Sequence, residues 1–311
     1  MKVFVAGATG AIGRPLVANL IASGHQVIGT TKSERGRALL VELGATPVIL
    51  DALNAEAVQA AIERVRPHVV VDELTALPKH YTSEAMQDAF ALHLRLRIEG
   101  GANVQRAAEE SGVRRYVMQS GAFVFAPGQG LADERAPFAV DAPAGVAATA
   151  RMYDDVERRA QQSLKMEVLI LRYGIFYGPG AWFDKDGDIA DQVRSRRFPV
   201  IGQGQGVWSF VHAADAAAAT VAALRGAPGI YNIVDDQPIG LGVWLPAFAD
   251  WVGAPPPPKI KEEEALAVAN RDFVYYATRL RGASNAKARS EFGFRPRRLE
   301  WLGHAAAHRQ F

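Results

Sequence analysis

The stretch "VFVAGATGAIGRPL", residues 3–16, decides the fold of this chain. Four apolar residues lead directly into glycines at positions 7, 10 and 13, and a helical pattern follows. In a strand–turn–helix unit, these glycines permit the tight turn, let backbone N–H groups approach a pyrophosphate, and let the helix pack closely on the strand. The amino end of the helix then offers free N–H groups and a positive dipole end to phosphate. The stretch therefore predicts a dinucleotide-binding turn made by Gly7, Gly10 and Gly13.

Alternation of strands and helices continues through the first half of the chain. The predicted strands are residues 2–6, 26–30, 47–50, 68–72, 114–119 and 167–172, and the predicted helices are residues 11–23, 34–43, 55–64, 84–111 and 146–165. Nearly all-apolar strands that alternate with helices are typical of a parallel sheet covered on both faces. We therefore predict an α/β fold with a doubly wound, mostly parallel sheet.

The pattern changes after Arg172, where glycines and prolines cluster. We predict a nucleotide-binding domain of residues 1–172, to which residues 207–234 return. Residues 173–206 and 235–311 are predicted to form a smaller C-terminal lobe that binds substrate.

Composition excludes several classes of function. The 311 residues carry a net charge of +2 without a block of lysine and arginine, which argues against a nucleic-acid partner. The chain has no cysteine, so disulfides, thiolate catalysis and zinc–thiolate sites are excluded, and a cytoplasmic enzyme is expected. No apolar run reaches the roughly 20 residues of a membrane span, and no metal-binding motif is complete.

Four motifs carry a resemblance to a known family. They are "GATGAIG" at 7–13, "RYVMQSGAFVFA" at 115–126, "LRYGIFYGPG" at 171–180 and "SFVHAADAAAA" at 209–219. With them the chain resembles the short-chain dehydrogenase/reductase superfamily, in particular its extended branch, the NAD-dependent epimerase/dehydratase family, and some atypical members. The resemblance implies a Rossmann-like fold, a nicotinamide cofactor, a small-molecule substrate and a homodimer formed through helices 84–111 and 146–165.

The resemblance also implies which residues contact the cofactor. These are Gly7, Thr9, Gly10, Ala11, Ile12, Gly13, Asp51, Leu53, Leu74, Thr75 and Tyr173. Thr31 occupies the place where members that use NAD carry an acid, and Lys32 and Arg35 follow it. Cations at this strand end favour the 2′-phosphate of NADP, so NADP is predicted over NAD.

The catalytic positions depart from the family pattern. Family members use a tyrosine for proton transfer, a lysine four residues later and a serine near the substrate carbonyl. This chain has Tyr153 but Glu157 in place of the lysine, and Gly121 at the usual serine position with Ser120 one residue early. A nearby anion raises the pKa of a phenol, so Glu157 favours Tyr153 as a neutral proton donor over a base. The family's helix asparagine is replaced by Arg97.

Two interpretations of Tyr153 remain open. It is either a catalytic residue together with Ser120, or one member of an apolar stripe that packs in the core. The stripe has helical spacing and consists of Met152, Tyr153, Val156, Ala160 and Leu164.

Substrate contacts are predicted at Tyr81, Tyr177 and Trp208. Trp208 lies where sugar-nucleotide enzymes of the family carry a basic residue, which favours a less charged substrate. The leading hypothesis is an NADP(H)-dependent oxidoreductase that reduces a carbonyl of a small, partly apolar substrate. The alternatives are a nucleotide-sugar epimerase or dehydratase, and a non-catalytic NADP-binding regulatory protein.

Overall fold

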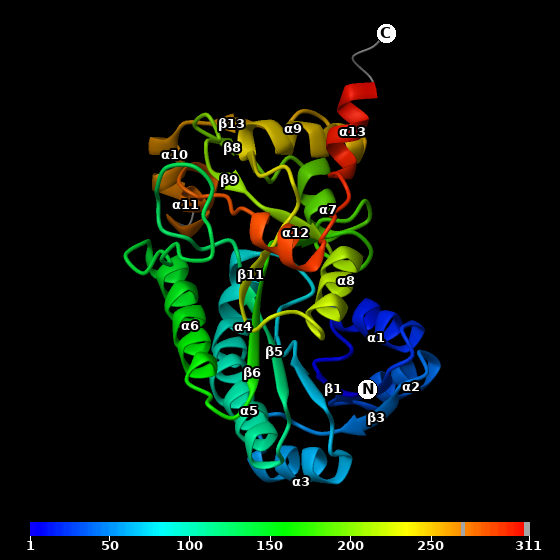
Figure 1. The fold of residues 1–311 in the computed structure, drawn as a ribbon. Coiled ribbons are helices and arrows are strands. Elements are labelled where there is room, and N and C mark those ends of the chain that lie inside the picture. The colour runs from blue at the N-terminus through cyan, green and yellow to red at the C-terminus, as the bar shows by residue number, and fades with distance from the viewer. Residues whose placement is uncertain (269–270, 308–311) are drawn as a thin grey trace.

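A seven-stranded parallel sheet forms the centre of the computed structural model, which describes residues 1–268 and 271–307 (Figure 1). Across the sheet the strands lie in the order β11 (Gly229–Ile233), β6 (Glu167–Tyr173), β5 (Arg115–Gly121), β4 (Val69–Asp72), β1 (Lys2–Ala6), β2 (Gln26–Thr31) and β3 (Thr46–Ile49). The order reverses between β1 and β4, so their carboxyl ends form the crevice where such sheets bind ligands. The glycine turn follows β1 at this crevice.

Helices cover both faces of the sheet (Figure 1). One face carries α3 (Ala55–Val65), α4 (Ser83–Arg95), α5 (Gly101–Glu110) and α6 (Ala144–Gln161), and the other carries α1 (Gly13–Ala22), α2 (Glu34–Glu42), α8 (Ala213–Ala223) and α12 (Ala286–Phe292). Strand side chains alternate between the two faces and are buried on both. This explains why the central strands are apolar almost throughout.

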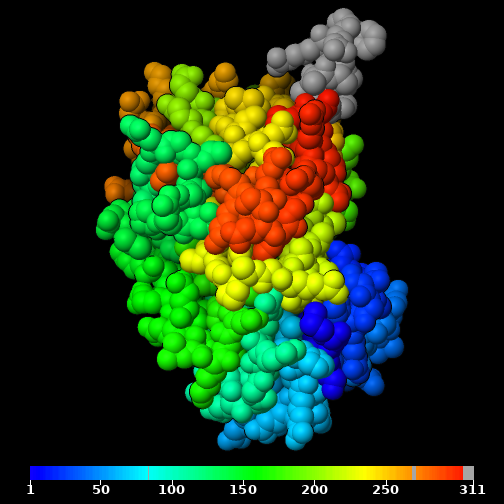
Figure 2. Space-filling view, viewed as in Figure 1, coloured from blue at the N-terminus to red at the C-terminus, as the bar shows by residue number. Residues whose placement is uncertain are grey.

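The remaining segments build a lobe with its own aromatic core. Three strand pairs contribute to it: β7 (Ile175–Tyr177) with β10 (Phe210–His212), β9 (Val207–Trp208) with β12 (Ile239–Gly240), and β8 (Val200–Ile201) with β13 (Lys259–Ile260). Its helices are α7 (Asp188–Arg194), α9 (Leu241–Trp251), α10 (Glu262–Val268), α11 (Arg271–Thr278) and α13 (Glu300–Ala307). In the space-filling view, lobe segments after residue 235, in yellow to red, lie over the upper part of the molecule (Figure 2).

The α/β class and the parallel sheet are confirmed, and the six predicted strands up to residue 172 lie within two residues of the observed ones. One prediction about the helices was wrong. Residues 84–111 do not form a single α-helix, because the π-helical segment η1 (Leu96–Gly100) separates α4 from α5. A π turn takes more residues than an α turn, so it rotates the side chains that follow it.

Two further details differ from the predictions. Helix α6 ends at Gln161, so Leu164 lies beyond it and is 98% exposed instead of completing the apolar stripe. Helix α12, predicted as part of the lobe, packs against α8 and β11 of the sheet. Residues 269–270 and 308–311 of the predicted lobe lie outside the described residues. Within the described part of the chain, no helix combines the length and the apolar character needed to cross a membrane.

Candidate active site

The glycine turn is packed so tightly that two of its positions exclude a side chain. Gly7 has φ of +80°, and a Cβ there would lie 2.3 Å from the carbonyl oxygen of Glu73. A Cβ on Gly13 would lie 2.3 Å from the carbonyl oxygen of Gly7. Among the described residues, no side chain caps the amino end of α1, where Ile12 is the residue before the first helical turn. A close backbone approach and an uncapped helix end are the features that suit a pyrophosphate.

The end of β2 carries hydroxyl groups and cations. Thr31 is 7% exposed, and its Oγ1 accepts a hydrogen bond from the N–H of Ser33. Lys32 is held by an ion pair with Asp51, with 2.7 Å between Nζ and Oδ2. This pair lowers the pKa of Asp51. Arg35 is exposed and has no partner among the described residues. The predicted cofactor residues Thr31, Lys32 and Asp51 therefore lie together, but the charge of Lys32 is paired with that of Asp51.

The other predicted cofactor residues lie near the same sheet edge or behind it. Leu74 and Thr75 follow Glu73 in the segment after β4, and the N–H of Leu53 donates to Asp51 Oδ1. Tyr173 is buried, and its hydroxyl hydrogen-bonds to Glu73 and to Thr220. Its role as a cofactor contact stays a prediction, because the hydroxyl is already engaged inside the protein.

Burial changes the ionisation of Glu73, which lies directly after β4. The loss of solvent raises the pKa of its carboxyl to about 8, although the Tyr173 hydroxyl opposes the shift. Oxygen Oε2 has no hydrogen-bond partner among the described residues. Glu73 is therefore mostly protonated at neutral pH.

Glu157, the residue in place of the family lysine, forms a buried ion pair. Arg172 on β6 donates from Nε to Oε1 at 2.8 Å and from the terminal nitrogen to Oε2 at 2.7 Å. The hydroxyl of Ser120 also donates to Oε1, at 2.5 Å. Ser120 was predicted as a catalytic residue, but its proton is directed to Glu157. The negative charge of Glu157 is thus balanced by Arg172 rather than left facing Tyr153.

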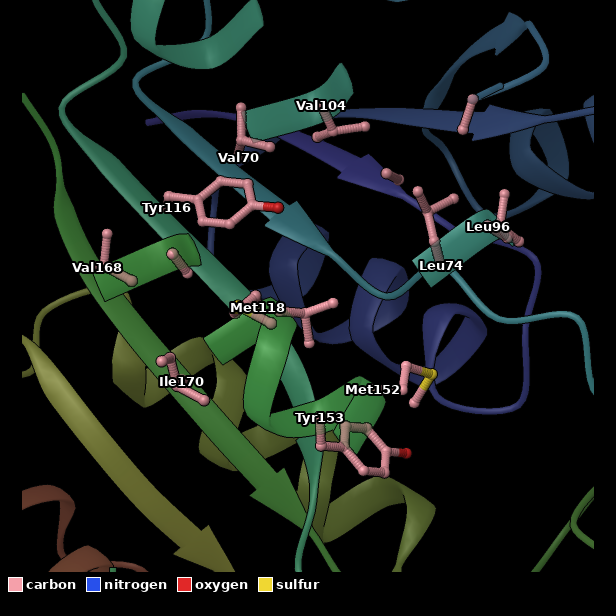
Figure 3. Close-up of a cluster of buried hydrophobic side chains, with 14 of the residues drawn as sticks. Val70, Leu74, Leu96, Val104, Tyr116, Met118, Met152, Tyr153, Val168 and Ile170 are labelled. Atoms are coloured by element: carbon pink, nitrogen blue, oxygen red, sulfur yellow. The ribbon is translucent and has the colours of Figure 1, made fainter. Parts of the chain in front are cut away.

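Tyr153 lies at the edge of the buried cluster on this face of the sheet. Figure 3 shows it on α6 beside Met152, with its hydroxyl directed away from Met118 and Ile170. The residue is 5% exposed, yet among the residues placed in the structure none hydrogen-bonds to its hydroxyl. Burial raises the pKa of Tyr153; Arg97 opposes this shift and Glu157 adds to it. The side chain therefore takes part in the core, while its hydroxyl remains available.

Gly121 explains why the serine of the family pattern is absent. A Cβ at this position would lie 2.7 Å from Cε2 of Tyr153 and 2.9 Å from Cε1 of Phe123. The ring of Tyr153 stands edge-on to Phe123, with 5.9 Å between ring centroids. The Tyr153 ring therefore occupies the space that a residue-121 side chain would need.

Arg97 reaches the same place from the π-helical segment η1. It is 3% exposed and donates hydrogen bonds to the carbonyl oxygens of Leu74 and Gln119, which lie at the carboxyl ends of β4 and β5. Its guanidinium carbon lies 5.8 Å from the centroid of the Tyr153 ring. In the sequence, Arg97 is recognisable only as a departure from the family pattern. Nothing in its local sequence indicates that it contacts residues on two strands.

Aromatic residues also lie where the lobe meets the sheet cluster that contains Tyr153. Tyr276 on α11 packs against both the sheet cluster and the lobe core. Burial raises the pKa of Tyr276, and the electrostatic influence of Tyr81, Asp272 and Tyr153 adds to the shift. Tyr81 packs on Trp182 with 4.8 Å between ring centroids. The loop that carries Tyr81 is tied to the lobe, because Asp188 accepts its N–H at 2.8 Å.

Two other predicted substrate residues are core residues of the lobe. Tyr177 is 1% exposed, and Trp208 is 3% exposed with its indole N–H donated to the carbonyl oxygen of Tyr276. Their roles as direct substrate contacts stay predictions.

Comparison with known proteins identifies the family. The family model described as "NAD dependent epimerase/dehydratase family" matches residues 3–234. The chain belongs to the NAD-dependent epimerase/dehydratase family. The predicted family is thereby confirmed, and with it an NAD(P)-dependent oxidoreductase.

Three relatives refine this picture. A "3-diazoavenalumate denitrifying reductase" from a Streptomyces species is 41% identical over 304 residues, covering 97% of this chain and 98% of the relative. A "4-hydroxy-2-methyl-3-oxo-4-farnesyl-3,4-dihydroquinoline-1-oxide ketoreductase" from Stigmatella aurantiaca is 26% identical, covering 81% of this chain and 74% of the relative. The structure of the Thermus thermophilus UDP-glucose 4-epimerase in complex with NAD has a TM-score of 0.73 at 23% identity, covering 97% and 96% of the two chains. The likeness to the epimerase shows the fold, and the two reductases agree with an oxidoreductase.

Proposed function

We propose that this protein is an NADPH-dependent reductase that transfers hydride to the carbonyl carbon of a small, partly apolar substrate. The observation that carries the proposal is the hydroxyl of Tyr153, which is unpartnered among the described residues. A series of contacts links it to the cofactor turn. The backbone of Gly7 packs on that of Glu73, and Leu74 follows Glu73 in the chain. The carbonyl oxygen of Leu74 accepts a hydrogen bond from Arg97, and the guanidinium of Arg97 lies over the Tyr153 ring.

The reaction assigns one proton transfer to this chain. The reduced nicotinamide supplies hydride to the carbonyl carbon. Tyr153 donates its phenolic proton to the carbonyl oxygen as the new C–H bond forms, and the product is an alcohol. The resulting phenolate regains a proton from water. The raised pKa of Tyr153 keeps the phenol protonated at neutral pH, as a proton donor requires.

The side chains around Tyr153 support an aromatic or otherwise flat, apolar substrate. Phe123 packs on Tyr153, Tyr276 lies within electrostatic range of Tyr153, and Tyr81 lies within the same range of Tyr276. The hydroxyls of Tyr81 and Tyr276 have no hydrogen-bond partner within the described ranges. Trp182 holds the Tyr81 loop by donating its indole N–H to the carbonyl oxygen of Pro78 at 3.1 Å. Rings with free hydroxyls bind flat apolar groups that carry a few acceptors.

The preference for NADP rests on the end of β2. No carboxylate stands at Thr31, where a ribose-binding acid is expected for NAD. Arg35 is a cation without a partner in the described residues, and Lys32 becomes available to a 2′-phosphate if it leaves Asp51.

A second substrate class is favoured by the 41% identity to the denitrifying reductase over nearly the whole chain. In this reaction hydride adds to the carbon of an aryl diazonium ion and the C–N bond breaks. The products are an arene, N₂ and the oxidised cofactor. This reaction consumes no proton, so it does not need Tyr153 as a donor.

One experiment separates the two reactions. NADPH consumption is measured with a panel of aryl ketones and with aryl diazonium salts, for the wild type and Tyr153→Phe. Carbonyl reduction by Tyr153 predicts a loss of about 100-fold or more in the Phe variant. Full carbonyl turnover by Tyr153→Phe would refute the proposed donor, and turnover of diazonium salts alone would favour the second class. Calorimetry with UDP tests the sugar-nucleotide alternative, for which no binding is expected.

A further inference from the structure

We propose that Arg97 is the cation that stabilises the phenolate of Tyr153. It takes the place of the family lysine, but it reaches Tyr153 from the π-helical segment η1 and not from α6. This inference rests on the proposed proton transfer, because a phenol that gives up its proton leaves a negative charge in a buried site. Such a charge is costly unless a cation lies nearby.

The charges around Tyr153 support Arg97 over the other cation in this region. Arg172 is committed to Glu157 through two hydrogen bonds and also stacks on Phe138, 4.5 Å from the ring centroid. Arg97 has no carboxylate partner in the described structure. It donates only to two backbone carbonyls, and its Nε has no partner there. Its charge is therefore the one left to interact with a new anion.

The position of Arg97 is fixed from three directions. Its two carbonyl acceptors belong to Leu74, two residues after β4, and to Gln119 in the neighbouring strand β5, so the guanidinium cannot swing away without losing both hydrogen bonds. The π turn of η1 directs the residue inward, and π turns of this kind often occur at functional sites. Gly100 follows within η1, where a Cβ would lie 3.1 Å from Cδ1 of Leu96 and 3.4 Å from Cβ of Ala52. The backbone that carries Arg97 is therefore closely packed.

The neighbours of Arg97 respond to its charge. Burial and Arg97 together lower the pKa of His93 to about 4, and Nδ1 of His93 accepts the N–H of Ala76, as a neutral imidazole does. Arg97 also opposes the rise in the pKa of Glu73. The groups that act on Tyr153 itself are Arg97 and Glu157, the latter balanced by Arg172, and Tyr276 lies within electrostatic range.

The test measures the titration of Tyr153 without any substrate. Tyrosine labelled with ¹³C at Cζ is introduced, and the Tyr153 signal is assigned by its loss in Tyr153→Phe. Arg97→Gln removes the charge but keeps a donor, whereas Arg97→Lys keeps the charge. We expect the Tyr153 titration to move to higher pH in Arg97→Gln and to stay close to the wild type in Arg97→Lys. Arg158 is an exposed arginine on α6, the helix that carries Tyr153, so Arg158→Met is the matched control. This variant should not shift the titration of Tyr153.

Turnover provides the second readout. With an accepted carbonyl substrate, Arg97→Gln should lower kcat by about 10- to 100-fold and move the high-pH loss of activity to higher pH. Arg97→Lys should recover most of the loss. A merely structural role would lower activity without moving the pH profile. If the Tyr153 titration moves in Arg97→Gln but the wild type reduces no carbonyl substrate, the interaction between Arg97 and Tyr153 stands and only the proposed reaction is refuted.

The wild type alone can overturn the inference if the variants do not fold. Every influence on Tyr276 raises its pKa, whereas Arg97 lowers that of Tyr153. Tyr153 should therefore titrate at lower pH than Tyr276 in the wild type. The inference is refuted if Tyr153 titrates at or above Tyr276, or if its titration is unchanged in folded Arg97→Gln.

Discussion

Replacing Glu157 by the family's lysine should destabilise this protein instead of restoring a typical active site. The side chains of Arg172 and Glu157 are 6% and 4% exposed, so their ion pair is almost fully buried. Breaking a buried pair from one side costs about 3–5 kcal/mol, because the remaining charge stays without a partner. Glu157→Lys also places a second cation directly against Arg172, so the upper end of this range is expected.

The predicted loss can be measured by unfolding. At roughly 2 °C per kcal/mol for a chain of this size, Glu157→Lys should melt about 6–10 °C below the wild type. Asp154→Lys is the control, because Asp154 lies on the same helix in an exposed pair with Arg158 and its reversal should cost under about 1 kcal/mol. The double variant Glu157→Lys/Arg172→Glu should recover part of the loss. The reasoning is wrong if Glu157→Lys melts within about 2 °C of the wild type.

Three further predictions concern the cofactor site, the site of the missing serine and pH. Asp51→Asn should release Lys32 and improve NADPH binding relative to NADH by up to about fivefold in fluorescence titrations, the worth of one exposed ion pair. Gly121→Ser should force the Tyr153 ring to move, lower stability by about 1–3 kcal/mol in urea unfolding, and reduce carbonyl turnover. Between pH 4.5 and about 8, Glu73 keeps its proton in the folded protein but loses it in the unfolded chain. The free energy of unfolding of the wild type should therefore fall as the pH rises through this range, relative to that of Glu73→Gln.

Each of these predictions has a clear contrary result. An unchanged ratio of NADPH to NADH affinity in Asp51→Asn would mean that Lys32 does not face the 2′-phosphate. A fully stable and active Gly121→Ser would show that the Tyr153 ring has room to move. Parallel pH–stability curves for the wild type and Glu73→Gln would mean that Glu73 is charged in the folded protein.

The fold was predictable because its signals are local. The glycine turn and the all-apolar strands follow from neighbouring residues, and these elements lie close to their predicted places. The charge arrangement was not predictable in the same way. Glu157 and Arg172 lie 15 residues apart and meet only across the packing of α6 on the sheet. Sequence spacing correctly placed Glu157 one turn from Tyr153, but it could not show that Arg172 balances its charge.

Arg97 was the residue whose contribution the sequence could not reveal. Helical periodicity predicts one continuous helix over residues 84–111, because no proline interrupts it, and a π turn has no strong local signal. The contacts of Arg97 with β4, β5 and Tyr153 depend on that turn. The Gly121 position was visible as a departure from the family, but its reason lies in the Tyr153 ring above it.

The most direct test of the central claim is NADPH-dependent reduction of aryl ketones by the wild type, Tyr153→Phe and Arg97→Gln, measured as kcat across pH. We predict that the wild type reduces a member of the panel, that Tyr153→Phe loses about 100-fold or more in kcat, and that Arg97→Gln is slower with its loss of activity at high pH displaced to higher pH. Undiminished reduction by Tyr153→Phe would show that Tyr153 is not the proton donor.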